Sequence, residues 1–116
     1  MATFTKALLS GSTNGKAILV TATATTGTTI HTAVAGTSAL DEIWIYAVNT
    51  SATAVKLTLE WGETAAPQGN IEITIPGECG ILEIVPGFPL QNGLVVTAFA
   101  GTGSVIALHG YVNKIA

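Results

Sequence analysis

The stretch VKLTLEW, residues 55–61, alternates apolar and polar side chains at every position. Successive side chains of a β-strand point to opposite faces, so this period of two predicts a strand with one buried face. The stretch IEITI, residues 71–75, alternates in the same way. These two stretches predict that the chain folds as β-sheet.

The same period recurs along the rest of the chain, with clusters of Gly, Asn, Ser and Pro between the runs. Thr and Val, which dominate the runs, suit a pleated surface better than a helix. No window combines a 3.6-residue apolar period with capping residues, so we predict little or no helix. The other predicted strands are 3–9, 16–23, 28–34, 41–49, 80–85, 93–100 and 104–113.

Eight or nine short strands separated by turn signals predict an all-β fold, and the length of 116 residues fits a single domain spanning 1–116. We expect an antiparallel β-sandwich, with a jelly roll of about eight strands as the first choice. An immunoglobulin-like sandwich is the second choice, because its Cys–Trp–Cys framework is absent.

Charged residues make up 9% of the chain, whereas soluble domains average about 25%. Two explanations fit: an uncharged polar surface rich in Thr and Ser, or a surface covered by other subunits. Depletion of charge is typical of the core of an interface, and we favour the second explanation. The net charge of −3 and the absence of arginine argue against direct binding of nucleic acid.

The chain has no apolar run of the length that a membrane helix needs, and its first residues do not resemble a signal peptide. The lone Cys79 has no partner for an internal disulfide, which agrees with a reducing cytosol. We expect a structural or incidental role for it, and no membrane partner for the chain.

Three runs are apolar on both faces of the predicted strand: 43–48, 94–99 and 105–108. They either lie centrally under loops or pack against neighbouring copies, because large exposed apolar patches usually mark interfaces. We predict that strands 43–48 and 94–99, with the neighbouring strand 105–112, form a contact between subunits. The predicted interface residues are Trp44, Tyr46, Val48, Val95, Phe99, Ile106 and Leu108.

The ionisable residues form no recognisable site. His31 and His109 lack a His, Cys or Asp neighbour at metal-ligand spacing, and no serine has a nucleophile motif. The pair Asp41-Glu42 has the chemistry to help bind a hard cation, although a solvated loop end is favoured. We therefore predict no catalytic residue, no metal, no cofactor and no enzyme activity; a cleft holding His31 or His109 beside a carboxylate would reopen that question.

Several loops have motif-like sequences. We interpret Gly11–Gly15 as a hairpin loop, the glycosylation-like Asn49-Thr50-Ser51 as the loop before the next strand, and Asn92-Gly93 as a tight hairpin turn. The four prolines stand at run ends, where they limit edge pairing. The aromatics Trp44, Tyr46, Trp61 and Tyr111 keep a carbohydrate-binding or host-recognition module open as the alternative; that reading needs two of these rings exposed and coplanar.

Four stretches carry a family resemblance: FTKALLSGSTNGKAILV (4–20), TTIHTAVAGTSALDEIWIYAVNTSATAVKLTLEWG (28–62), IVPGFPLQNGLVVTAFAG (84–101) and HGYVNKI (109–115). In their Thr/Ala/Gly-rich strands and scarcity of charge they resemble small β-rich virion proteins of tailed bacteriophages, particularly capsid decoration (cement) proteins. The resemblance implies a virion protein, assembled in the host bacterial cytoplasm, that binds the major capsid protein or another virion protein. It further implies a homo-oligomer, commonly a trimer, that stabilises the assembled head. A tail, neck or head-fibre component would resemble it equally.

Overall fold

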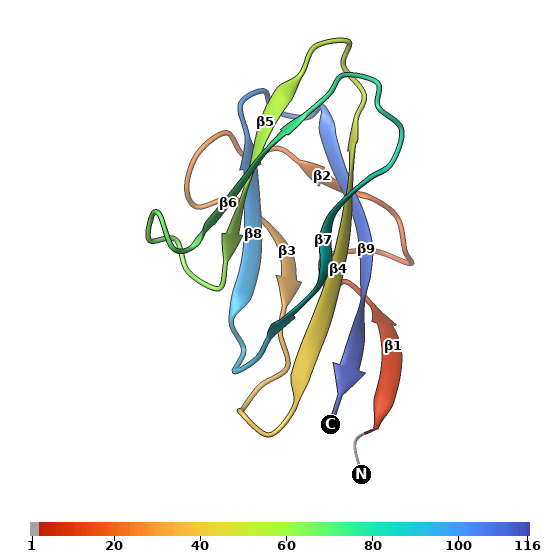
Figure 1. Cartoon of the computed structure of the whole chain (residues 1–116), viewed down its shortest axis with the longest axis vertical. Helices are drawn as coiled ribbons and strands as arrows, with labels where there is room; N and C mark the ends of the chain where they lie inside the picture. Colours follow the sequence, from red (N-terminus) through yellow and green to blue (C-terminus); the bar gives the residue numbers. More distant parts are fainter. Residues whose placement is uncertain (1–2) are drawn as a thin grey trace.

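The computed structural model describes residues 3–116, and in that part of the chain the regular structure consists of nine strands and no helix (Figure 1). This confirms the predicted all-β class. The strands are β1 Phe4–Leu8, β2 Ile18–Val20, β3 Thr28–Thr32, β4 Leu40–Asn49, β5 Val55–Trp61, β6 Asn70–Ile75, β7 Leu82–Leu90, β8 Val95–Ala100 and β9 Ile106–Ile115.

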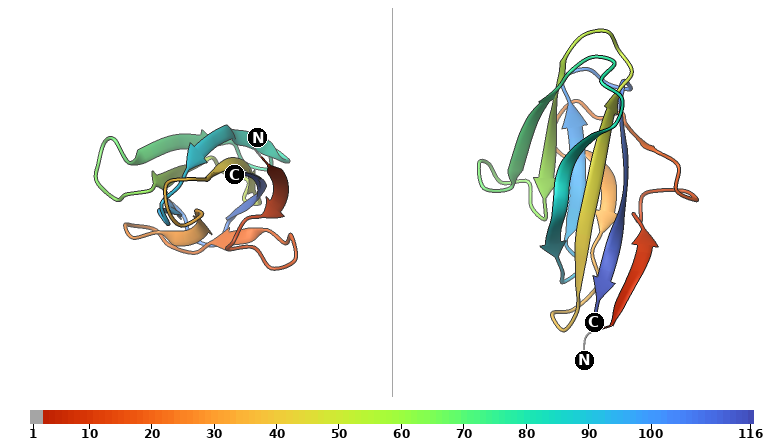
Figure 2. Two further views of the ribbon diagram at one scale, coloured as in Figure 1. Left: turned by 90° about the horizontal axis from the view of Figure 1, so that it is seen from below. Right: turned by 45° about the vertical axis from the view of Figure 1, so that its right-hand side comes forward.

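The strands form two antiparallel sheets that pack as a sandwich (Figures 1 and 2). Sheet A has the order β1-β9-β4-β7, and the short β2 pairs with β9 beyond the end of β1. Sheet B has the order β3-β8-β5-β6. The predicted antiparallel sandwich is therefore confirmed.

The pairing between strands is nested about the middle of the chain. β5 pairs with the next strand, β6, while β4 pairs with β7, β3 with β8, and both β1 and β2 with β9. Each pair lies in one sheet, and successive pairs alternate between sheets B and A. The two ends of the chain consequently lie side by side, where the backbones of Thr3 and Ala116 exchange two hydrogen bonds (Figure 1).

The core lies between the sheets and consists of the inward-facing member of each alternating pair. As predicted for 55–61, Val55, Leu57 and Leu59 are buried on the inner face, but the outward-facing Thr58 and Glu60 are buried too, so β5 is not exposed on one side as expected. The other buried apolar residues of this cluster are Leu9, Ile18, Val20, Ile30, Ile43, Ile45, Ala47, Ile75, Val85, Val96, Ala98, Ala100, Ile106, Leu108 and Val112.

The prediction that all prolines stand at run ends is wrong for two of them. The strand predicted at 80–85 is β7, which extends to Leu90 and contains Pro86 and Pro89. β7 is the edge strand of sheet A, and two register shifts interrupt its pairing with β4. A proline is tolerated at an edge because it removes a backbone donor on the unpaired side.

Two loops predicted as hairpins connect strands that are not paired with each other. Asn92 and Gly93 have φ of 63° and 69°, the left-handed conformation of a tight turn, but they join β7 in sheet A to β8 in sheet B. The backbone N–H groups of Asn92 and Gly93 donate to the carbonyls of Gly36 and Val34, so the turn is tied to the loop before β4. The Gly11–Gly15 loop joins β1 to β2, which pair in succession with β9.

We predict that Gly110→Ala lowers the free energy of unfolding by roughly 1–3 kcal/mol. A Cβ on Gly110 would overlap the backbone carbonyl oxygen of Trp44 on the neighbouring strand β4, so the two central strands of sheet A would have to separate. Urea denaturation measures the change. Gly101→Ala is the control, because a Cβ there meets only the carbonyl oxygen of Lys56, at 3.9 Å; equal losses in the two variants would contradict the prediction.

Candidate functional site

The outer face of sheet A carries a cluster of large side chains that we call the outer-face patch: Trp44, Tyr46 and Val48 on β4, with His109 and Tyr111 on β9. The register places Trp44 opposite Tyr111 and Tyr46 opposite His109. All five side chains are half-buried, although no loop crosses the middle of this sheet (Figure 2, right). They bury each other sideways and leave their outer surface toward solvent.

Three side chains from adjacent strands line up across the patch. The rings of Trp44 and Tyr111 stack with centroids 5.9 Å apart and planes 11° apart. The Lys6 ammonium on β1 lies 4.5 Å from the centre of the Tyr111 ring, a favourable cation–π contact. β1 and β4 flank β9 on opposite sides, so both faces of the Tyr111 ring are occupied.

Polar groups fix the rim of the patch. Glu42 accepts a hydrogen bond from Trp44 Nε1 at 3.1 Å and another from Asn113 Nδ2 at 3.0 Å. The bonds from Asn113 and Trp44 hold the pKa of Glu42 below its usual value, so it is ionised at neutral pH. Desolvation raises the pKa of Tyr46, and its neighbours Tyr111 and Glu83 raise it further, which keeps the phenol neutral.

The structure divides the predicted interface residues among three places. Trp44, Tyr46 and Val48 belong to the outer-face patch, whereas Val95 and Phe99 lie half-buried on the outer face of sheet B. Ile106 and Leu108 were wrongly assigned to a surface: both are fully buried, because their side chains point between the sheets. On β9 the outward residues are instead Ala107, His109, Tyr111 and Asn113.

The outer face of sheet B differs from that of sheet A, because part of it is covered by the segment 21–27. Beneath this segment Glu60 is 1% exposed, and three hydrogen bonds surround its carboxylate. The donors are Thr97 Oγ1 at 2.6 Å, the backbone N–H of Gly27 at 2.8 Å and Thr25 Oγ1 at 2.8 Å. A buried charge is tolerated where it is hydrogen-bonded in this way, so Glu60 attaches the segment to the sheet.

The structure brings His31 next to a carboxylate, a pairing that the sequence did not reveal. His31 Nε2 lies 2.7 Å from Asp41 Oδ2, and Nδ1 accepts a hydrogen bond from the backbone N–H of Ser10 at 2.9 Å. Nδ1 is therefore the unprotonated nitrogen, and Nε2–H donates to Asp41. Asp41 also lies 3.2 Å from the Lys114 ammonium. His31 and Asp41 are 2% and 0% exposed, so this pair opens into no cleft and joins strands β3, β4 and β9.

The remaining candidate residues are separated or enclosed. Asp41 and Glu42 point to opposite faces of sheet A, because neighbours in a strand alternate, so they do not form a joint cation site. Asn49 is 1% exposed, and its amide donates to the carbonyls of Thr53 and Ile75. Within residues 3–116, no group of three or more His, Cys, Asp and Glu side chains is placed to hold a metal ion.

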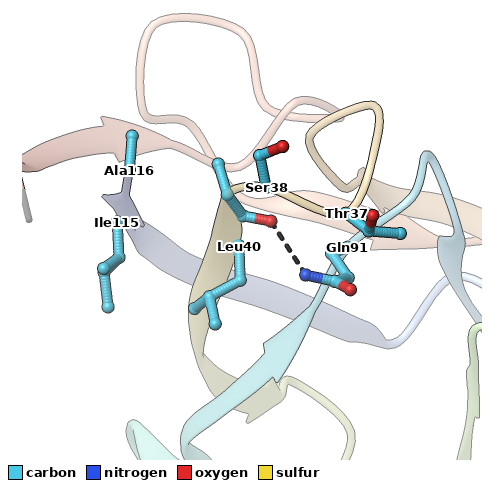
Figure 3. A pocket seen from close by; sticks show the side chains of 7 residues that line it. Thr37, Ser38, Leu40, Gln91, Ile115 and Ala116 are labelled. Atoms are coloured by element: carbon cyan, nitrogen blue, oxygen red, sulfur yellow. Dashed lines mark hydrogen bonds between the residues drawn. The ribbon is translucent and has the colours of Figure 1, made fainter.

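Two open hollows lie away from the patch. One, of about 430 Å³, is at the end of the sandwich, where Gln91 Nε2 donates to the carbonyl of Ala39 at 2.9 Å (Figure 3). Its lining has no ionisable side chain, and it consists of Thr37, Ser38, Ala39, Leu40, Gln91, Ile115 and Ala116. The other, of about 270 Å³, is lined by Ala66, Pro67, Asn70 and Glu72. Neither brings together groups that suit catalysis.

Comparison with protein-family models, with curated proteins and with solved structures finds no match. No helix that could span a membrane occurs in the described part of the chain.

We predict that Glu60 makes the stability of the protein depend on pH. Burial raises the pKa of Glu60, but the hydrogen bonds from Thr97, Gly27 and Thr25 outweigh it, and the pKa lies below the ordinary value of 4.5. A lowered pKa in the folded state contributes stability above pH 4.5, which is lost as the pH falls through the folded-state pKa. The stability difference between wild type and Glu60→Gln should therefore be largest near neutral pH and should shrink below pH 4.5.

Chemical denaturation from pH 7 to pH 3 measures this difference. Glu63→Gln is the matched control, because Glu63 is exposed and its only hydrogen bond in the described structure is a 3.3 Å contact from Gln68. A difference that stays constant over the whole range would show that the charge of Glu60 is not what stabilises the 21–27 segment.

Proposed function

We propose that the protein is a non-enzymatic virion structural protein of a tailed bacteriophage, which decorates and stabilises the assembled head as a homo-oligomer, commonly a trimer. The observation that carries the proposal is the outer-face patch. Four aromatic or imidazole rings and a valine on two central strands present their outer surface to solvent, and the charged side chains Lys6, Glu42 and Glu83 lie around them. Contiguous apolar surface of this kind is typical of a protein–protein interface.

In this proposal the patch makes the contact between copies, and the oligomer then binds the major capsid protein or another virion protein. A protein that binds only the assembled shell stabilises it by mass action. An oligomer binds a symmetric lattice through several equivalent contacts, so modest individual affinities combine through avidity. A surface with four lysines and no arginine also loses little side-chain entropy on docking.

We also infer that the sandwich is a jelly roll. The nested pairing β5·β6, β4·β7, β3·β8 and (β1, β2)·β9 supports this, because a jelly roll is a double-sheet fold of eight strands built from two Greek keys. With β1 and β2 counted as one interrupted strand, residues 3–116 form eight strands, four in each sheet.

The carbohydrate-binding alternative is favoured by the nearly parallel Trp44 and Tyr111 rings. Sugar stacking needs an open ring face, however, and the faces of Tyr111 are occupied by Trp44 and Lys6. Trp61 lies apart and packs edge-on against Phe88. The patch is therefore better suited to a protein surface than to a sugar ring. A tail, neck or head-fibre location would use the same patch in the same way.

We predict that Val48→Glu converts the oligomer to a monomer at micromolar concentration. The substitution places a charge in the outer-face patch, where its desolvation in a subunit contact would cost several-fold to more than tenfold in affinity. Size-exclusion chromatography with light scattering measures the mass. The matched control is Thr74→Glu, which adds the same charge to an exposed outward position on sheet B.

A monomeric wild type would contradict the subunit contact, and equal effects of the two variants would contradict its location. Binding to heads prepared without the protein, followed by electron microscopy of decorated particles, tests the virion role separately. Specific binding on a glycan array, lost in Trp44→Ala, would favour the carbohydrate alternative.

A further inference from the structure

Strand β1 forms one margin of sheet A, and within the described chain no other strand lies beyond it, although the loop between β1 and β2 comes next to Leu8 at its end (Figures 1 and 2). The backbones of Thr3 and Ala116 exchange two hydrogen bonds. This pair shows which residues of β1 form backbone hydrogen bonds to β9. In an antiparallel pair every second residue bonds to the partner strand. Thr5 and Ala7 therefore bond to β9, opposite Lys114 and Val112.

The intervening residues of β1 direct their backbone groups the other way. The N–H and C=O groups of Phe4, Lys6 and Leu8 point away from β9, toward the open margin of the sheet. The side chains of the same three residues lie on the outer face, and Phe4 is 69% and Leu8 52% exposed. The margin thus presents a regular row of unpaired backbone groups between two exposed apolar side chains.

The margins formed by β7, β3 and β6 lack this combination. β7 is interrupted by Pro86, Pro89 and two register shifts. The margin of β3 is already occupied, because Gly11 N–H donates to the Ile30 carbonyl and Thr32 N–H donates to Ser10 Oγ. β6 carries no exposed large apolar side chain. Prolines, bulges, charged side chains and covering segments are the usual protection of sheet edges; within Phe4–Leu8, β1 has no proline and no bulge, and its one charged side chain is Lys6.

The charge on β1 decides what kind of strand fits. Lys6 stands between Phe4 and Leu8, and β1 has no carboxylate. In a symmetric antiparallel pairing of two copies centred on Lys6, the two lysines would lie directly opposite each other, and like charges in that position are destabilising. An acidic residue opposite Lys6, with apolar residues opposite Phe4 and Leu8, would instead pair favourably at all three positions.

We propose that the open margin of β1 is a docking site for an extended segment of a partner protein with the pattern apolar-x-acidic-x-apolar. The segment adds a strand to sheet A through the backbone groups of Phe4, Lys6 and Leu8, the mode known as β-augmentation. This site adjoins the outer-face patch through Lys6, but it uses the edge of sheet A rather than its face and does not depend on the virion role.

The probe is the blocked synthetic peptide Thr-Val-Thr-Glu-Thr-Val-Thr, added to the isotopically labelled protein and followed by NMR hydrogen exchange. At saturation the amides of Phe4, Lys6 and Leu8 should exchange roughly tenfold more slowly, since exchange then requires release of the strand. The amides of Thr5 and Ala7 already bond to β9 and should change little. The same peptide with Lys in place of Glu should bind roughly fivefold more weakly.

Lys6→Glu should reverse the preference between the two peptides, whereas Lys56→Glu on sheet B should leave it unchanged. If Lys6→Glu does not fold, the affinities of the wild-type protein for the Glu peptide and the Lys peptide test the proposal. Equal affinity for both peptides, or no slowing at the three amides, would overturn the proposal. If amide exchange at these three residues slows with increasing protein concentration in the absence of peptide, the margin pairs with a second copy of the chain instead.

Discussion

The pairing of β4 with β9 is the constraint on which the rest of the structure depends. The two strands pair over ten residues, from Leu40 opposite Ile115 to Asn49 opposite Ile106. Because the side-chain period is two, this single register decides which apolar residues enter the core and which form the outer-face patch. A shift by one residue would expose Ile45 and bury Tyr46, so the register is specified by the burial of one face. The close approach at Gly110 adds a second, steric requirement at the centre of the same pair.

A chain with so few charges uses several of them inside the fold. Glu60 holds the 21–27 segment on sheet B, and Asp41 joins His31 and Lys114 between strands of both sheets. Each buried carboxylate has several donors, which offsets the cost of removing it from water. These groups resemble sites by their chemistry, yet their burial and complete hydrogen bonding give them a structural role.

The outer-face patch and the open margin of β1 follow from the same arrangement of sheet A. The alternation that places Trp44 and Tyr111 outward also places Phe4, Lys6 and Leu8 outward. The backbone N–H and C=O groups of the same three residues of β1 point away from β9. Lys6 links the two features, because its ammonium lies over the Tyr111 ring while its backbone faces the margin. The face carries the proposed subunit contact, and the edge carries the proposed strand docking.

The sequence by itself determined the strands and the sandwich, because both depend on local alternation and turn residues. Residues 55–61 and 71–75 show this directly, since their odd positions face the core side. The sequence could not determine which face of strands 43–48 and 105–108 is buried. Both faces of these strands carry apolar side chains, so the alternation does not distinguish the core side from the outer side. Only the tertiary structure assigned Ile106 and Leu108 to the core, and only it brought Glu60 to Thr25 and His31 to Asp41. Those contacts join residues from different strands, and their positions depend on how the two sheets fold over each other rather than on any local pattern.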